Sequence, residues 1–152
     1  MQLADVMATD VLTVSPDTTL ADAARRMIAR DAGAAVVMDD GELVGVISER
    51  DLMRAIPDAC EPDTPVSDRM TRHVLTGAAS TSIAEAMAIM IEGRFRHLPV
   101  VEEGRVLGIV SMRDLMSWTA LRLRQGALGE GDDEVDSAEL LATIHRMRTG
   151  AA

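Results

Sequence analysis

The sequence predicts an α+β fold, with helices layered on sheet, built from two copies of one strand-helix-strand-strand-helix unit. Residues 7–53 align with residues 70–116 without a gap, at a constant offset of 63 positions, and 17 of the 47 aligned pairs are identical. Each copy has one apolar stripe of helical period and two apolar runs joined by a turn. A unit of about 50 residues leaves much apolar surface exposed, so we expect the copies to pack together.

Each copy begins with a short extended segment, residues 12–14 and 75–77, followed by a helix. The helices are predicted from apolar residues that recur at i, i+3, i+4, i+7 and i+8. Each helix starts with a hydroxyl residue followed by an acid three positions later, a pair that satisfies amide donors of the first turn. The capping pairs are Thr19 with Asp22 and Ser82 with Glu85, and the stripes are Leu20, Ala23, Ala24, Met27, Ile28 and Ile83, Ala86, Met87, Met90, Ile91.

Two strands and a second helix complete each copy. The strands of a copy are joined by an acidic turn that ends in glycine, which is a hairpin signal. The second helix begins at the serine that follows the second strand. The expected strands are 35–38, 43–47, 98–101 and 106–110, and the expected helices start near Ser48 and near Ser111, the latter extending to Arg124.

The rest of the chain is linker and tail. The stretch Pro57–Pro65 contains three prolines and several acids, and it has the length to bring the second copy beside the first. The predicted division is a repeat at 6–56, a linker at 57–68, a repeat at 69–119, and a C-terminal helical extension with a tail at 120–152. Within the tail, 126–134 is rich in glycine and acid, and 135–148 has the spacing of a short amphipathic helix, either a frayed end or a dimer-packing element.

Composition excludes several classes of protein. The net charge of −10, from 25 acidic and 15 basic residues, disfavours nucleic-acid binding. The first residues lack a basic start followed by an apolar run, and no stretch has the roughly 20 apolar residues of a membrane helix, so we expect no membrane association. One cysteine, Cys60, and no zinc-type spacing suit a reducing cytoplasm and predict no metal site. No nucleophile-base-acid set stands apart from the repeat, so we expect no enzyme.

The run Gly-apolar-apolar-Ser-x-Arg-Asp-Leu occurs twice, at Gly45–Leu52 and at Gly108–Leu115. It resembles the signature of the CBS domain family, and the resemblance extends over residues 6–119. The segment Arg96–Val100 also matches that family's pattern. The resemblance implies a pseudo-two-fold pair with two clefts, often occupied by AMP, ADP, ATP or S-adenosylmethionine, and further association into a homodimer. We expect no other domain in this chain, so the regulated partner would be a separate, unknown protein or would be absent.

The same resemblance implies roles for individual residues. Asp51 and Asp114 would accept hydrogen bonds from the ribose hydroxyls of a ligand. Phosphate or sugar contacts would come from Ser48, Ser111, Arg50, Arg113, Arg96 and His97. The base would lie against aliphatic residues and backbone groups of the opposite copy, at Val11, Thr13, Val14, Val36, Val37, Val74, Thr76, Gly77, Pro99, Val100 and Ile109.

Simpler interpretations stay open for these residues. Each Ser-x-x-Asp is also an ordinary helix cap. The aliphatic residues suit core strands, and Arg96 with His97 suits an exposed loop pair. The first repeat has Gly33 and Ala34 where the second has Arg96 and His97, so the two clefts are expected to differ in affinity or ligand type.

Two functions are consistent with this sequence. The leading hypothesis is a regulatory module in which an adenosine-type ligand changes the packing between the repeats and the surface shown to a partner. The alternative is a ligand-free dimerisation scaffold, favoured if the two aspartates only cap helices.

Overall fold

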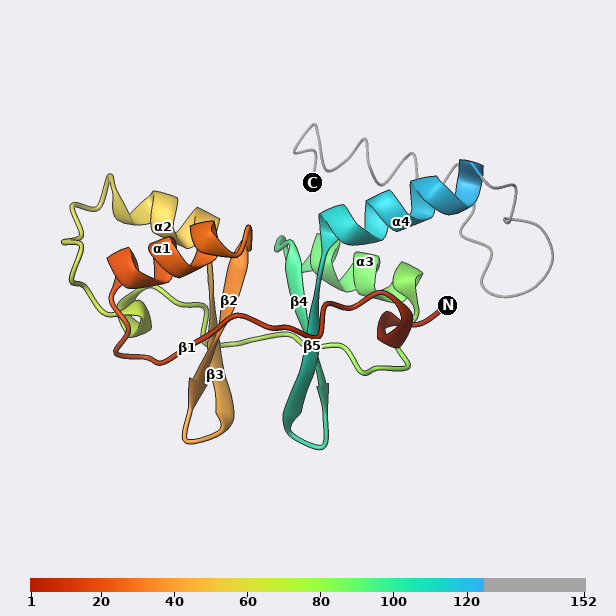
Figure 1. Cartoon of the computed structure of the whole chain (residues 1–152), viewed down its shortest axis with the longest axis horizontal. Coiled ribbons are helices and arrows are strands. Elements are labelled where there is room, and N and C mark those ends of the chain that lie inside the picture. Colours follow the sequence, from red (N-terminus) through yellow and green to blue (C-terminus); the bar gives the residue numbers. More distant parts are fainter. Residues whose placement is uncertain (125–152) are drawn as a thin grey trace.

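The structure is a computed structural model that describes residues 1–124, and its two halves lie side by side (Figure 1). Each half consists of a hairpin covered by two helices. The expected glycine-rich segment 126–134 and helix 135–148 lie outside the described residues. The elements of the first half are β1 (Thr13–Val14), α1 (Leu20–Ala29), β2 (Ala34–Asp39), β3 (Glu42–Ser48) and α2 (Glu49–Ala55), and those of the second are α3 (Ile83–Glu92), β4 (His97–Glu102), β5 (Arg105–Ser111) and α4 (Met112–Arg124).

The helices begin where the hydroxyl-acid pairs predict. The side chain of Thr19 accepts a hydrogen bond from the backbone of Asp22 at 3.1 Å, and Ser82 accepts one from Glu85 at the same distance. The apolar stripes of both helices face inward over most of their length, with Ala23 and Ala86 fully buried, whereas Ile28 at the end of the first stripe is exposed. In each half a helix precedes the hairpin and a second helix follows it, which confirms the predicted α+β repeat.

Both hairpins close through a tight turn that needs two residues in the left-handed region. In the first hairpin Asp40 has φ 45° and Gly41 has φ 85°; in the second Glu103 has φ 49° and Gly104 has φ 77°. Such turns match the right-handed twist of the flanking strands, and glycine adopts them without steric strain. The acid-glycine pair read from the sequence is therefore what closes each hairpin.

The two sheets differ in one strand. In the first half β1 pairs in parallel with β2, and the amide of Val36 donates to the carbonyl of Leu12 at 3.0 Å. The equivalent of Val36 in the second repeat is Pro99, which has no amide hydrogen to donate. The expected strand 75–77 is reduced there to a bridge between Gly77 and Val100, and the second sheet has two strands among the described residues.

The opening segment of each repeat packs on the other repeat. We call residues 2–8 arm 1 and residues 65–71 arm 2. Arm 1 crosses to the second half, where Ala8 and Ile109 exchange backbone hydrogen bonds of 2.9 and 3.0 Å. Arm 2 makes the equivalent exchange with the first half, between Thr71 and Val46, at 2.9 and 3.0 Å. Both crossings are visible as the red and green segments of Figure 1.

The arms also complete the two hydrophobic cores. Leu3 of arm 1 is fully buried among residues of α3, β4, β5 and α4. Val66 of arm 2 is fully buried among residues of α1, β2 and β3. Leu3 and Val66 are 63 positions apart, and at the same offset Ala8 corresponds to Thr71 and Val46 to Ile109. The predicted pseudo-two-fold relation therefore holds for the arms as well as for the repeats. Val66 lies in the stretch 57–68 expected as linker; the boundaries drawn from the sequence stay a prediction.

Candidate functional site

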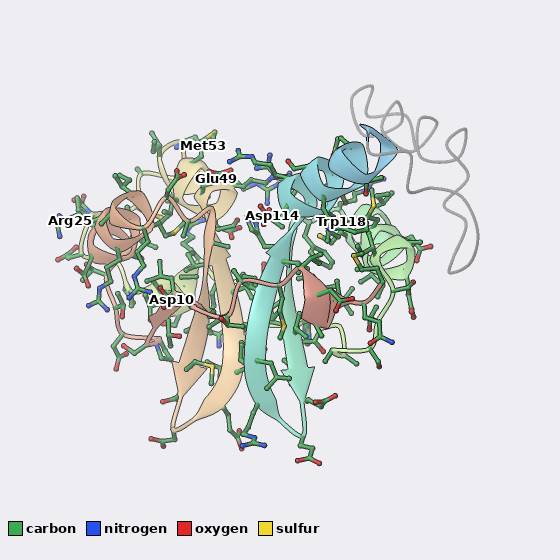
Figure 2. All side chains as sticks on the ribbon, turned by 45° about the vertical axis from the view of Figure 1, so that its right-hand side comes forward. Asp10, Arg25, Glu49, Met53, Asp114 and Trp118 are labelled. Carbon is green, nitrogen blue, oxygen red and sulfur yellow. The ribbon has the colours of Figure 1, made fainter. Side chains whose placement is uncertain are left out.

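Two clefts lie between the repeats, one beside the start of α2 and one beside the start of α4, and we call them the Asp51 cleft and the Asp114 cleft. Residues of both repeats line each of them. The Asp51 cleft encloses about 200 Å³, and the Asp114 cleft, which continues along α1, encloses about 1110 Å³. Figure 2 shows Glu49 and Asp114 at the helix starts on either side of the space between the repeats.

The two aspartates occupy equivalent positions in helix caps. Oδ2 of Asp51 accepts hydrogen bonds from the backbone amide of Ser48 at 2.9 Å and from its hydroxyl at 2.7 Å. Oδ2 of Asp114 does the same with Ser111, at 3.2 and 2.5 Å. Within residues 1–124, all hydrogen bonds made by these two carboxylates use Oδ2. Each carboxylate therefore caps its helix through Oδ2, and each of the two aspartates also lines a cleft.

Arg96 and His97 lie at the centre, because both line both clefts. Arg96 forms a 3.1 Å ion pair with Glu49 of the opposite repeat. The imidazole of His97 lies directly over Gly33, where a Cβ atom would come within 2.7 Å of Nε2. Burial, followed by the positive charge of Arg96, lowers the pKa of His97 below its usual value, while the charge of Glu49 acts in the opposite direction.

The other two predicted arginines differ in their surroundings. Arg50 lies at the Asp51 cleft, and its Nη1 donates to the backbone carbonyl of Arg94 at 3.0 Å, which links α2 to the loop before β4. Arg113 is exposed at the wall of the Asp114 cleft. The two arginines therefore face different clefts, although they occupy equivalent positions in the repeat.

The residues expected around a base fall into two groups. Val74 lines the Asp51 cleft and Ile109 lines the Asp114 cleft. The others are absent from both walls within the described residues. Val14, Val36, Val37, Pro99 and Val100 are buried in strands and Gly77 is buried at its bridge to Val100, whereas Val11 is half-buried and Thr13 and Thr76 are exposed.

The clefts also contain charged residues that the sequence interpretation did not select. Asp10, Asp31 and Glu49 line the Asp114 cleft, and Arg54 and His73 line the Asp51 cleft. A signal for them exists in the repeat. The residue 63 positions from Asp10 is His73, and the residue 63 positions from Glu49 is Met112, so these are places where the two copies differ in charge.

The comparison with family models agrees with the repeat. The model of the CBS domain matches residues 3–58 and residues 61–120. The chain belongs to the CBS domain family. The CBS domain-containing protein YhcV of Bacillus subtilis is 35% identical over 112 residues, covering 73% of this chain and 80% of YhcV.

Solved CBS structures share the fold. The CBS-domain containing protein ATU1752 of Agrobacterium tumefaciens has a TM-score of 0.74 and 37% identity, covering 78% of this chain and 99% of ATU1752. The CBS domain pair of MJ0100, solved in complex with 5′-methylthioadenosine and S-adenosyl-L-methionine, has a TM-score of 0.75. Its identity is 22%, and the match covers 80% of this chain and 98% of that one, so this likeness concerns the fold.

Pairs of CBS domains are generally regulatory modules rather than catalysts. Within residues 1–124 of this CBS pair, no group of three or more histidine, cysteine, aspartate or glutamate side chains is placed to hold a metal ion. No helix in the same part of the chain has the length and apolar character needed to cross a bilayer.

Proposed function

We propose that this CBS pair is a sensor that binds an adenosine-type ligand, AMP, ADP, ATP or S-adenosylmethionine, and passes its occupancy to a separate protein in the cytoplasm. The observation that carries the proposal is the position of Asp51 and Asp114. Each aspartate lines a cleft and uses Oδ2 for its helix cap, so its second carboxylate oxygen, Oδ1, would accept hydrogen bonds from ribose hydroxyls. The adenosine ligands of the MJ0100 CBS pair support this choice of ligand class.

The clefts offer the remaining contacts that such a ligand needs. Val74 and Ile109 provide aliphatic wall, and backbone groups of residues 73–75 and of Asp10, which also line the clefts, can read the edge of a base. Arg96 and His97 can meet a negatively charged group at the centre. A ligand that bridges both repeats would favour one packing of the halves over another, and such a difference in affinity is the requirement for signalling.

Isothermal titration with AMP, ADP, ATP and S-adenosylmethionine tests the proposal. Saturable binding of at least one ligand is expected, and Asp51→Ala or Asp114→Ala should weaken it about tenfold to a hundredfold. The control is Asp22→Ala, because Asp22 has the same position in the first turn of α1 but lies outside both clefts. Absence of binding to a folded protein would overturn the proposal.

The alternative function is a ligand-free homodimerisation scaffold. The helix caps favour it, since they give both aspartates a structural role. Exposed apolar side chains on α1 and near α2 favour it too: Ile28, Met53 and Ile56 are 81%, 66% and 77% exposed. Under this alternative, Asp51→Ala lowers the free energy of unfolding by about 1 kcal/mol, as the loss of a cap does, and no adenosine ligand binds.

A further inference from the structure

The two clefts differ in the charge of their walls. In the Asp51 cleft the described wall carries Arg50, Arg54 and Arg96 against one carboxylate, that of Asp51. His73 lies on the same wall and adds a further hydrogen-bonding group. Arg96 is paired with Glu49, so Arg50 and Arg54 remain to face the carboxylate of Asp51, and this cleft has an excess of positive charge.

The Asp114 cleft has the opposite balance. Its wall carries the carboxylates of Asp10, Asp31, Glu49 and Asp114 against the guanidinium groups of Arg30, Arg96 and Arg113. Two of these arginines are already paired, Arg30 with Asp10 and Arg96 with Glu49, both at 3.1 Å. Asp31 and Asp114 are thus left to face one further guanidinium, so the wall is acidic overall.

This difference arises at matched positions of the repeat rather than from scattered surface charge. Asp10 of the Asp114 cleft corresponds to His73 of the Asp51 cleft. The position of Arg54 in the first repeat holds Ser117 in the second, and Glu49 is replaced by the buried Met112. The same backbone frame therefore presents two walls of opposite charge.

We propose that the clefts divide adenosine ligands by charge: the Asp51 cleft takes a phosphorylated adenosine, and the Asp114 cleft takes an uncharged or positively charged adenosine without phosphate. The inference rests on the proposed function. The Asp51 cleft is the smaller of the two, which favours the shorter monophosphate, and its Arg50 and Arg54 can neutralise the phosphate. The larger Asp114 cleft has room for a longer cationic substituent beside Asp31.

The probes are AMP and S-adenosylmethionine, titrated separately into the wild type, Asp51→Asn and Asp114→Asn. Asparagine keeps an acceptor for the helix cap and removes the charge, so the variants should fold. The affinity for AMP should fall about tenfold or more in Asp51→Asn and less than about twofold in Asp114→Asn. The affinity for S-adenosylmethionine should fall by about tenfold or more in Asp114→Asn and by less than about twofold in Asp51→Asn. As an independent readout, AMP should shift the NMR signal of His73, which lines the Asp51 cleft, and S-adenosylmethionine should leave it in place.

Two further variants test charge itself. Arg54→Gln should weaken AMP about fivefold, with Arg25→Gln, an exposed arginine of α1 away from both clefts, as the control. Asp31→Asn should weaken S-adenosylmethionine by a similar factor. Asp31 has φ 49°, a conformation that asparagine also adopts, and Asp40→Asn is the control because Asp40 has φ 45° in a turn outside both clefts.

The outcomes separate this inference from the proposed function. AMP binding that depends on Asp114, or competition of both probes for one cleft, overturns the division by charge and leaves the sensor function standing. A folded protein that binds neither probe overturns both.

Discussion

Gly33→Ala should displace the imidazole of His97. The new Cβ would lie 2.7 Å from Nε2 and 3.0 Å from Cε1, whereas ordinary contacts begin at 3.4 Å, so the ring must retreat by about 0.7 Å. Crowding of this kind costs about 1 to 3 kcal/mol. Because the ring borders two clefts and has room to move, we expect about 1 kcal/mol of the free energy of unfolding to be lost, measured by urea denaturation.

The pKa of His97 provides the sharper test. Burial and Arg96 hold this pKa below 6.5, while Glu49 and Asp114 oppose them. The unfolded chain therefore binds the proton first as pH falls, and the stability associated with neutral His97 is present above about 6.5 and declines as pH falls toward the folded pKa. A ring moved into water should titrate closer to 6.5, with a smaller loss of stability in acid.

NMR titration of the imidazole Cε1 protons from about pH 4 to about pH 8 measures this change. The signal of His97 is assigned as the one that is lost in His97→Gln. The packing of His97 on Gly33 is refuted if the Gly33→Ala variant keeps the wild-type pKa at His97.

Three further predictions concern the arms, the caps and the exposed apolar surface. Leu3→Ala removes three carbons from a fully buried site and should lower the free energy of unfolding by about 3 kcal/mol, read from Trp118 fluorescence in urea; a loss under about 1 kcal/mol would mean that arm 1 is not docked. Ser48→Ala should lower it by about 1 kcal/mol, and an unchanged denaturation midpoint would argue against the cap. Ile28→Glu combined with Ile56→Glu should convert a homodimer to monomer in light scattering, whereas an unchanged mass would exclude this surface from the interface.

The order of the elements could be read from the sequence because each rests on local chemistry. The helical stripes, the hydroxyl caps and the acid-glycine turns all act within a few residues. The loss of the third strand from the second sheet could also have been predicted locally, because Pro99 has no amide hydrogen to donate to residues 75–77. These features depend on neighbours along the chain, which a sequence displays directly.

The arms and the cleft walls depend on contacts between distant residues. Ala8 pairs with Ile109 across the molecule, and no local pattern near either residue indicates the partner. The aliphatic residues Val36 and Val100 were expected near a base and are completely or almost completely buried, because β2 and β4 are covered on both faces and consecutive residues of each strand are buried. Glu49 was not predicted as a cleft residue, because its ion-pair partner Arg96 belongs to the other repeat and is distant in the sequence.

The exchange of the arms has a consequence for how such a chain can arise. One repeat with its own arm has an apolar side chain, Leu3 or Val66, whose binding site belongs to the other repeat. A single repeat would therefore bury its apolar arm residue only in a symmetric dimer, in which each copy packs its arm on the other. Duplication and fusion of the coding sequence would preserve every one of those contacts while freeing the two halves to diverge, and the opposite charges of the present clefts are a divergence that identical copies cannot achieve.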